Sequence, residues 1–259
     1  MKGLNVYTLF SGSKGNCTYV KYNGREILID AGVCEKQTEE SLKTLGTSLD
    51  SVTDIFITHD HTDHVRGLES ICKRHKLTVH MTAATAQAVL LGKPGETVLE
   101  SHVRIHPLVY AEEAGEITVI SFPTPHDSAS SVGYLVKTPE ATLGYATDLG
   151  YVSDSVRESL CGVNYAVLEA NHDVGVLQSG NYPLFLKKRI LSRKGHLSND
   201  AAAKLAAYLA QNGTTRFLLA HLSEQNNYPQ LAYAAVRAAL GEDGPYIAVA
   251  EKNRPTRLV

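Results

Sequence analysis

The sequence predicts an α/β fold in which two layers of β-sheet lie between two outer layers of helix, an αβ/βα sandwich. Short apolar runs rich in β-branched and aromatic residues occur in both halves of the chain, and each half also has stretches with helical apolar spacing. Polar residues of the metal-ligand type stand directly after several of those runs. Two successive halves of this kind fit such a sandwich, with a site where the two sheets meet.

The first half is expected to begin with a hairpin. Apolar runs predict strands at residues 4–10, 18–22, 26–29, 54–57 and 78–81, and edge strands within 98–109. Asn23-Gly24 is a favourable two-residue turn between the second and third of these strands. Apolar residues at helical spacing predict helices at 35–45, 66–74 and 82–91.

The second half repeats the pattern. It predicts strands at 116–122, 132–137, 141–146, 164–168, 217–220 and 246–250. An alanine-rich stretch predicts a helix at 199–211, capped by Ser198 or Asn199, and a further helix is expected at 229–240. No linker or low-complexity segment interrupts the chain, so we expect residues 1–259 to form one domain.

Composition points to a soluble protein in a reducing compartment. With 25 basic and 27 acidic residues the formal net charge is −2, so only local clusters of cations can indicate a nucleic-acid partner. The four cysteines are scattered without a CxxC pair, which favours reduced, packed thiols. The chain starts without a signal peptide and has no apolar run near the roughly 20 residues that span a bilayer. We therefore expect a cytoplasmic protein without a membrane partner, and the sequence indicates no protein partner.

The densest cluster of metal-ligand residues follows the apolar run 54–57. It contains His59, His61, Asp63 and His64, four donors within six residues. Imidazole and carboxylate are ligands for zinc, manganese or iron, and a tetrahedral ion takes only three or four of them. His59 and His61 alternate on an extended backbone and share a side, whereas the next two begin a turn, so more than one ion is expected. The histidines without such spacing are predicted to be surface or packing residues: His75, His80, His102 and His106.

This His-x-His-x-Asp-His pattern resembles the signature of the metallo-β-lactamase fold. Further residues typical of that fold follow apolar runs in the same order: Asp30, His126, Asp148 and His221. The resemblance implies a four-layer sandwich that binds two divalent ions, one through His59, His61 and His126. It places the other on Asp63, His64 and His221, with Asp148 bridging both and Asp30 orienting ligands without binding metal. We also predict a catalytic role for Asp63.

Such a pair of ions would activate a water molecule, because the pKa of metal-bound water falls to about 7. These nitrogen and oxygen ligands suit zinc and manganese alike, so the sequence does not choose between Mn and Zn. The metal site by itself predicts a hydrolase and leaves its substrate open.

A second motif, Gly195-His196-Leu197-Ser198-Asn199, precedes the predicted helix at 199–211. It resembles the phosphodiesterase and nuclease branch of the superfamily, in which a histidine and serine turn contacts the substrate phosphate. We therefore expect Ser198 and Asn199 to bind the substrate. His196 would stabilise the transition state or protonate the leaving oxygen, and Glu169 would orient it. The alternative is that His196 only packs beside a helix cap.

A basic run stands just before this motif. Five cations fall within the eight residues 187–194, among them Lys187, Lys188 and Arg193, for which we expect contacts with a phosphate backbone. The alternative is a solvated helix face.

Three motifs together resemble the YycJ (WalJ) family of metallo-β-lactamase-fold proteins. They are Leu-Phe-Ser-Gly-Ser-x-Gly-Asn at 9–16, Glu-Ala-Asn-His-Asp at 169–173, and Gly-His-Leu-Ser-Asn at 195–199. The resemblance implies a DNA exonuclease that acts 5′ to 3′ with manganese favoured, and it places His172 and Asp173 on the substrate side. The turn at 11–16 either cradles an anion with its amides or needs glycine only for its backbone angles.

Other functions stay open on sequence alone. A small-molecule phosphodiesterase or an RNA-processing nuclease would use the same ligands, and so would a thioesterase or other acyl hydrolase. The chain is too short for the additional β-CASP domain of the larger RNA-processing nucleases and has no long glycine-rich arm. A non-catalytic accessory that keeps metal only for folding is the remaining alternative, although a structural site would be closed to water.

Overall fold

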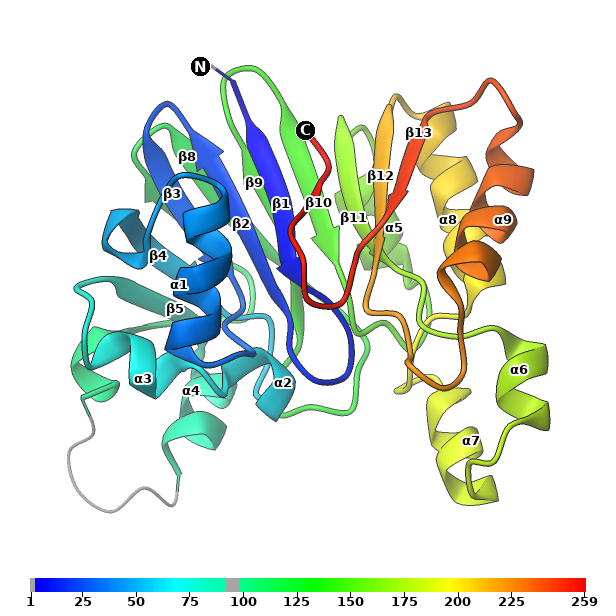
Figure 1. Cartoon of the computed structure of the whole chain (residues 1–259), viewed down its shortest axis with the longest axis horizontal. Helices are drawn as coiled ribbons and strands as arrows, with labels where there is room; N and C mark the ends of the chain where they lie inside the picture. The colour runs from blue at the N-terminus through cyan, green and yellow to red at the C-terminus, as the bar shows by residue number, and fades with distance from the viewer. Residues whose placement is uncertain (1–2, 92–97) are drawn as a thin grey trace.

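A computed structural model describes residues 3–91 and 98–259. Two seven-stranded sheets face each other in it (Figure 1). The first sheet has the order β14-β1-β2-β3-β4-β5-β6 and the second has the order β13-β12-β11-β10-β9-β8-β7. The strands of the first sheet are β14 (Thr256–Arg257), β1 (Asn5–Phe10), β2 (Cys17–Tyr22), β3 (Arg25–Ile29), β4 (Val52–Phe56), β5 (Thr78–Thr82) and β6 (Val103–His106). Those of the second are β13 (Tyr246–Val249), β12 (Arg216–Ala220), β11 (Tyr165–Glu169), β10 (Thr142–Ala146), β9 (Val132–Lys137), β8 (Ile117–Pro123) and β7 (Ala111–Ala114).

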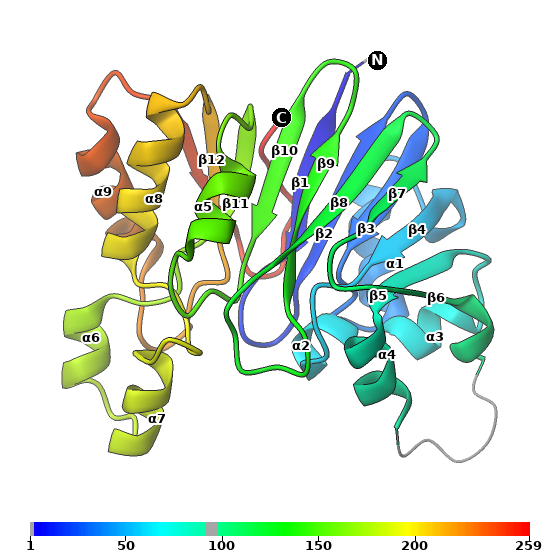
Figure 2. The same cartoon turned by 180° about the vertical axis from the view of Figure 1, so that it is seen from behind.

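Helices cover the outer face of each sheet (Figures 1 and 2). On the first sheet these are α1 (Glu35–Thr44), α2 (Thr62–Val65), α3 (Leu68–Cys72) and α4 (Ala83–Leu90). On the second they are α5 (Asp154–Leu160), α8 (Asn199–Gln211) and α9 (Pro229–Leu240). Short 3-10 helices lie at Leu49–Ser51 and Glu100–His102.

Three apolar cores lie between these layers. Side chains such as Val20, Phe56 and Tyr134 from both sheets are buried between the sheets. Two further cores lie under the helices, for example around Leu42 of α1 and around Leu205 of α8. A sheet that buries both faces needs an apolar layer on each, which explains the continuous apolar runs in the sequence. The prediction of an αβ/βα sandwich is confirmed.

Parallel pairing decides where the functional residues gather. Strands β3 to β6 run parallel to one another in the first sheet, and β10 to β13 do so in the second. The carboxyl ends of parallel strands meet at the same edge of a sheet, where ligand sites usually form. The candidate metal ligands that follow β4, β10 and β12, and Asp30 after β3, are therefore brought to a common edge.

The predicted helix at 66–74 is wrong in its extent. The chain instead forms two short helices, α2 and α3, that meet at Gly67. The amide of Gly67 donates to Ala31 O at 2.8 Å, and a Cβ on Gly67 would lie 1.9 Å from Val33 O. This close passage of two backbone segments breaks the helix and moves its start to Thr62, inside the ligand cluster.

Two helices that project from the sandwich were not predicted from the sequence. They are α6 (Val174–Ser179) and α7 (Leu184–Ile190), and both lie at the bottom of Figure 1, beyond the ends of the strands. Each is only two turns long or less, and so short a stretch shows little periodicity. The elements α5, β7 and β14 were missed for the same reason.

Two expectations about the environment concern the cysteines and the membrane. The structure describes all four cysteines and shows no disulfide between them. Within residues 3–91 and 98–259, no helix combines the length and the apolar character needed to cross a bilayer.

Candidate metal centre

Three residues at the ends of strands adopt an unusual backbone conformation. Asp30, Asp148 and His221 have φ angles of 63°, 58° and 58°. These values lie in the left-handed region, which residues other than glycine rarely adopt. Each stands one or two residues after a buried strand, β3, β10 or β12. Such strain persists only where the surroundings enforce it, and it gathers at functional sites.

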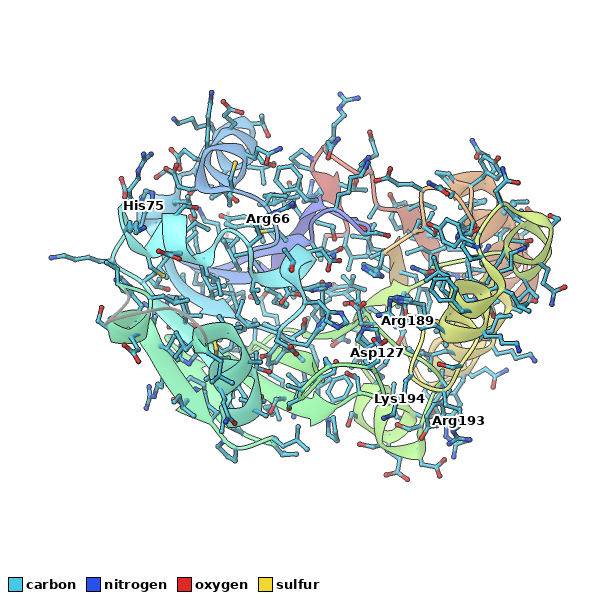
Figure 3. The ribbon with its side chains drawn as sticks, turned by 90° about the horizontal axis from the view of Figure 1, so that it is seen from below. Arg66, His75, Asp127, Arg189, Arg193 and Lys194 are labelled. Carbon is cyan, nitrogen blue, oxygen red and sulfur yellow. The ribbon has the colours of Figure 1, made fainter. Side chains whose placement is uncertain are left out.

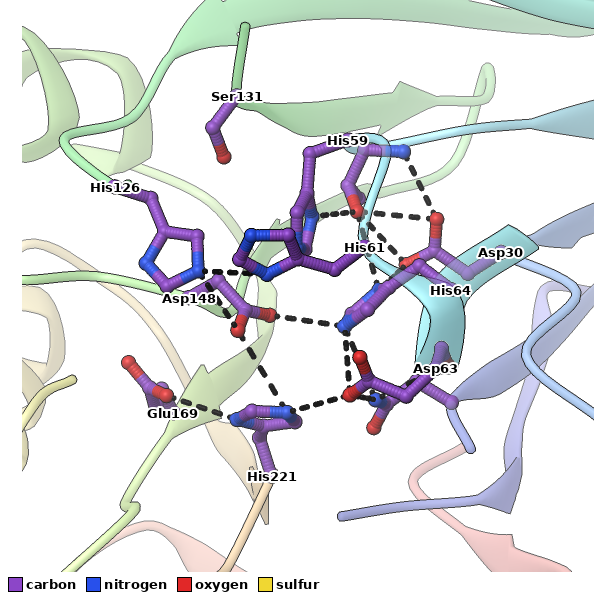
Figure 4. Close-up of polar contacts among 12 residues, drawn as sticks. Asp30, His59, His61, Asp63, His64, His126, Ser131, Asp148, Glu169 and His221 are labelled. Carbon is purple, nitrogen blue, oxygen red and sulfur yellow. Dashed lines mark hydrogen bonds and ion pairs between the residues drawn. The ribbon is translucent and has the colours of Figure 1, made fainter. Parts of the chain in front are cut away.

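The predicted ligands form two groups around one centre (Figure 4). The candidate ligand atoms of His59, His61 and His126 lie within 4.8 Å of one another. Those of Asp63, His64 and His221 do the same.

Asp148 lies between the two groups. Its Oδ2 is 3.3 Å from His64 Nε2 in one group, and its Oδ1 is 3.6 Å from His126 Nε2 in the other. Oδ1 also lies 3.6 Å from His221 Nε2. The side chain is 1 % exposed. A buried carboxylate that faces both groups is suitably placed to bridge two cations.

In most of the candidate ligand histidines, Nδ1 contacts another group of the protein and Nε2 points to the centre. Nδ1 of His59 contacts the Thr58 hydroxyl at 3.0 Å, and Nδ1 of His126 donates to Gly195 O at 3.0 Å. Nδ1 of His221 contacts Glu169 Oε1 at 3.0 Å. His61 is reversed, with Nε2 near Asp127 O and Nδ1 3.3 Å from His126 Nε2. Outer partners of this kind fix the tautomer that a metal ligand needs.

Several buried polar atoms at the centre lack a hydrogen-bond partner among the described residues. They include His59 Nε2, both carboxylate oxygens of Asp148 and His221 Nε2. Burying such atoms unsatisfied is costly. Divalent ions would satisfy all of them, and imidazole with carboxylate is a donor set that zinc and manganese accept. The residues present therefore fit divalent metal.

Asp30 supports the ligands from behind without facing the centre. It is fully buried, and its Oδ2 lies 2.7 Å from His64 Nδ1. Its Oδ1 accepts hydrogen bonds from the Thr58 amide at 2.8 Å and the Thr58 hydroxyl at 3.0 Å. Since Thr58 in turn contacts His59, one aspartate orients a histidine of each ligand group.

The candidate ligands strongly shift one another's pKa values. Burial alone would raise the pKa of Asp63 and lower that of His64, but the attraction between opposite charges outweighs it. The pKa of Asp63 is lowered, and that of His64 is raised to about 10. Burial lowers the pKa of His59 and of His126. Perturbation of this kind is typical of a functional site.

Glu169 and His196 form a pair beside this centre. Glu169 is fully buried, and its Oε1 lies 2.8 Å from His196 Nδ1. Its Oε2 accepts from the amides of Leu149 at 2.7 Å and Leu197 at 3.0 Å. His196 Nδ1 is also 3.6 Å from Asp148 Oδ1, so the predicted motif lies against the metal ligands.

Three of the residues expected on the substrate side already have partners within the protein. Ser198 Oγ caps α8 by accepting from the Ala201 amide, and Asp173 Oδ1 caps α6 by accepting from the Val176 amide. Asn199 is 2 % exposed and exchanges two side-chain hydrogen bonds of 2.9 Å with Asn227. His172 differs from them, because it is buried and neither ring nitrogen has a partner among the described residues.

The basic run lies on α7 and the loop after it. Figure 3 shows Arg189, Arg193 and Lys194 on the same side as Asp127. Lys188 and Arg193 are exposed, and the Arg193 guanidinium lies 4.0 Å from the centre of the Tyr151 ring. Lys187 Nζ instead donates to Gln178 O and Gly180 O at 2.7 Å and holds the loop between α6 and α7.

Sequence reasoning missed two residues that touch the ligands. Asn16 is buried, and its Nδ2 lies 3.1 Å from both Asp63 Oδ2 and His64 Nε2. Asp127 Oδ1 lies 3.4 Å from His126 Nε2, and its Oδ2 forms a 2.6 Å ion pair with Arg189. The conspicuous turn that ends in Asn16 and the sequence neighbourhood of His126 were the available signals.

Several backbone amides of the turn at 11–16 have partners within the protein. The Gly12 amide donates to Asn16 Oδ1 at 2.9 Å, and the Gly15 amide to Gly12 O at 3.1 Å. The Asn16 amide donates to Asp63 O at 2.8 Å. These contacts hold the turn and connect it with the ligand loop, and an anion-binding role for the turn stays a prediction.

Two other histidines form a separate buried contact. His80 Nδ1 lies 3.0 Å from His106 Nε2, and His80 Nε2 lies 3.0 Å from Asp54 Oδ1. With Glu112 they also bring three potential ligand atoms within 4.8 Å. The chain of hydrogen bonds already satisfies His80, so the prediction of packing histidines is confirmed for this pair.

Comparisons with known proteins show the family and the fold of the chain. Residues 25–222 match the family model of the β-lactamase superfamily domain. The chain is 36 % identical over 244 residues to the exodeoxyribonuclease YycJ of Bacillus anthracis, covering 93 % of this chain and 91 % of that protein. It is 32 % identical over 231 residues to the exodeoxyribonuclease WalJ of Streptococcus pneumoniae serotype 2, covering 89 % and 86 %. Among solved structures, unliganded yeast PDE1 has a TM-score of 0.74 at 15 % identity and full coverage of both chains, a likeness of fold.

Proposed function

Because the chain belongs to the β-lactamase superfamily, and within it to the family of the YycJ and WalJ exodeoxyribonucleases, we propose that it is a metal-dependent DNA exonuclease. We further propose that it shortens DNA strands in the 5′ to 3′ direction and uses two divalent ions, with manganese favoured. The direction and the choice of metal follow from the family resemblance. The use of two ions is also supported by the two ligand groups on either side of Asp148.

The proposal of a phosphodiester substrate rests on the Glu169–His196 pair, whose polar atoms lie 2.8 Å apart beside Asp148. A metal centre alone would serve an acyl hydrolase equally well. A histidine held by a buried carboxylate adds a proton donor and a cation within reach of the same centre. Phosphate transfer needs both, because negative charge develops on the phosphate and on the leaving oxygen.

Two divalent ions bound by the seven ligands would supply a water that ionises near neutral pH and a positive charge for the phosphate oxygens. The chain's own residues then act as follows. Glu169 accepts the hydrogen bond from His196 Nδ1 and leaves the other ring nitrogen for the substrate. In its protonated form His196 donates a proton to the leaving oxygen as the phosphorus–oxygen bond breaks. The products are a hydroxyl on one fragment and a phosphate monoester on the other.

Asp63 is proposed to act as a ligand and to orient the attacking water. Its side chain is 23 % exposed, whereas that of Asp148 is 1 % exposed, so it is the more accessible of these two carboxylates. Its Oδ2 lies 3.5 Å from Nε2 of both His64 and His221. A carboxylate oxygen in that position can accept a hydrogen bond from the nucleophile.

Lys188, Arg193 and Lys194 on and after α7 are proposed to contact the phosphate backbone of the DNA. All three are exposed, and they precede His196 in the chain. Cations on a helix that projects beside the centre can follow a strand whose end lies at the metal. Lys187 is proposed to act indirectly, since its ammonium holds the α6–α7 loop.

End-labelled substrates test this proposal. Duplex DNA, single-stranded DNA and RNA would carry a label at the 5′ or the 3′ end and be incubated with the protein and Mn²⁺. We expect early loss of the 5′ label from DNA, and a loss of rate of about 10²–10⁴-fold in His196→Ala. His75→Ala, a histidine on another part of the surface (Figure 3), is the matched control and should keep full activity. Intact polymers together with hydrolysis of a small phosphodiester would contradict the proposal.

A further inference from the structure

A cavity of about 480 Å³ opens beside His196, on the helix side of the second sheet. It is bounded by the loop that carries Tyr151, by α5 and by one side of α8 from Ala201 to Tyr208. Its volume falls within the ~300–1,000 Å³ typical of small-molecule sites. None of the ligand residues described above lines it, but His196 does, so the cavity adjoins the centre without belonging to it.

The inner wall of the cavity carries an unsatisfied histidine. His172 is 1 % exposed, and neither Nδ1 nor Nε2 has a hydrogen-bond partner among the described residues. Burial lowers the pKa of His172 to about 4, so the ring is neutral at working pH and offers one donor and one acceptor. Leaving both unsatisfied is unfavourable, and a ligand with a complementary donor and acceptor would remove that cost.

The other walls carry aromatic and apolar side chains. Tyr151, Tyr208 and Leu205 line the cavity, and the rim carries the exposed cations Lys204 and Arg157. Arg193 lies over the Tyr151 ring at 4.0 Å, which holds that ring in place. Aromatic faces with a neutral donor and acceptor suit a nucleobase, which stacks through its faces and hydrogen-bonds through its edge. A phosphate has no donor for a neutral imidazole nitrogen to accept from, and it would not stack.

His196 connects the cavity with the reacting phosphate. The same ring lines the cavity and lies 3.6 Å from Asp148 through Nδ1. A group linked directly to a phosphate at the metal centre would therefore reach into the cavity on the far side of His196.

We propose that this cavity receives the nucleoside at the end of the DNA strand, with its base against the tyrosines and its edge hydrogen-bonded to His172, whose buried ring turns toward the cavity when the base binds. The proposal rests on the proposed nuclease function and adds a residue that senses the terminal base. It also explains why a histidine is buried there without a partner among the described residues.

Equilibrium binding tests the cavity without any cleavage. The Mn²⁺-loaded protein would be titrated calorimetrically with deoxyadenosine 5′-monophosphate and with deoxyribose 5-phosphate, which keeps the phosphate and sugar but has no base. We expect the nucleotide to bind at least tenfold more tightly. Equal affinity for the two compounds would overturn the proposal.

Two variants assign the difference to the cavity. Ala201→Phe, at a partly exposed wall position on α8, should fill the space and abolish the preference for the nucleotide. His172→Phe keeps the ring volume but removes donor and acceptor, so nucleotide affinity should fall at least tenfold while the melting temperature stays equal or rises. A lower melting temperature with unchanged nucleotide affinity would show that His172 is structural and would overturn the proposal.

Cleavage provides the second readout. For the wild type, kcat/KM should be at least tenfold lower for removal of a terminal abasic nucleotide than for removal of a normal one. His172→Phe should show a smaller difference between these two substrates. If DNA is not cleaved at all, the nuclease function fails while the binding titration still decides whether a base occupies the cavity. Equal rates on both ends in the wild type would overturn the cavity's role in cleavage.

Discussion

The imidazole of His64 and the carboxylate of Asp30 are joined by a 2.7 Å contact between Nδ1 and Oδ2, and both side chains are fully buried. Asp30 also accepts from Thr58, which in turn contacts His59 Nδ1. Two histidines of the candidate metal centre are thus held from the end of β3, by a residue in the left-handed backbone region.

Replacing Asp30 should weaken metal binding more than it weakens the fold. Loss of an outer carboxylate typically lowers metal affinity about 10–100-fold. We expect Asp30→Ala to show this loss in a competition titration with a metal chelator. The matched control is Asp54→Ala, which removes a buried carboxylate paired with a histidine outside the ligand groups, His80, at 3.0 Å. Equal metal affinity in the two variants would contradict the role given to Asp30.

Gly32 is the residue that allows Asp63 its position. A Cβ on Gly32 would lie 1.7 Å from Asp63 O and 2.5 Å from the Asn16 amide, so one backbone segment would have to move. If the protein binds two metal ions as proposed, we expect Gly32→Ala to lose one of them, measured by elemental analysis of the purified protein. Gly24→Ala is the control, since no atom lies within 4 Å of the added carbon there, even though the φ of Gly24 is 82° and unfavourable for alanine. Two bound ions in Gly32→Ala would contradict this account.

The charge of Glu169 should contribute to stability in a pH-dependent way. Burial alone would raise the pKa of Glu169, but His196 and His221 outweigh it and lower the pKa to about 2 from the usual 4.5. A lowered pKa in the folded state stabilises the protein above pH 4.5, and this stabilisation is lost as the pH falls towards 2. In metal-free protein, Glu169→Gln should therefore be less stable than wild type by roughly 2–4 kcal/mol at pH 6.

Denaturant unfolding at pH 3 to 6 measures this difference, which should narrow as the pH falls. Glu158→Gln, an exposed glutamate on α5, should stay parallel to wild type throughout. A gap for Glu169→Gln that is constant with pH would mean that the charge of Glu169 is not what stabilises the site.

DNA affinity should depend on the exposed cations near α7. We expect Lys188→Glu and Arg193→Glu each to weaken DNA binding and to reduce the slope of log affinity against log salt by about 1. Lys76→Glu, an exposed lysine on another part of the surface, should change neither. Fluorescence anisotropy at several salt concentrations measures both quantities. Unchanged slopes in both variants would contradict this role and would indicate that the basic run is only a solvated helix face.

The sequence was informative where chemistry and spacing coincide. The cluster from His59 to His64 predicted a metal site because four such donors rarely stand so close together in a chain that binds no metal. Strand β12 with the following His221 was recognisable as an apolar run that ends in a ligand. The helix α8 was predicted with its observed bounds, since alanine spacing and the cap at Ser198 agree.

Other features arise only from contacts between distant segments. Asn199 and Asn227 are 28 residues apart, and nothing local indicates that their amides pair and are buried. The contact of Asn16 with Asp63 spans 47 residues. The left-handed backbone at Asp148 is enforced by packing, because aspartate by itself prefers other conformations.

The central claim is that metal held around Asp148 makes this chain a DNA exonuclease. The most direct test strips the protein of metal and titrates Mn²⁺ back, following bound metal and the shortening of end-labelled duplex DNA in the same samples. We expect shortening to appear only as the second equivalent binds, and Asp148→Ala to bind less metal and to leave the DNA intact. Shortening by the metal-free protein, or at the full rate by Asp148→Ala, would contradict the claim.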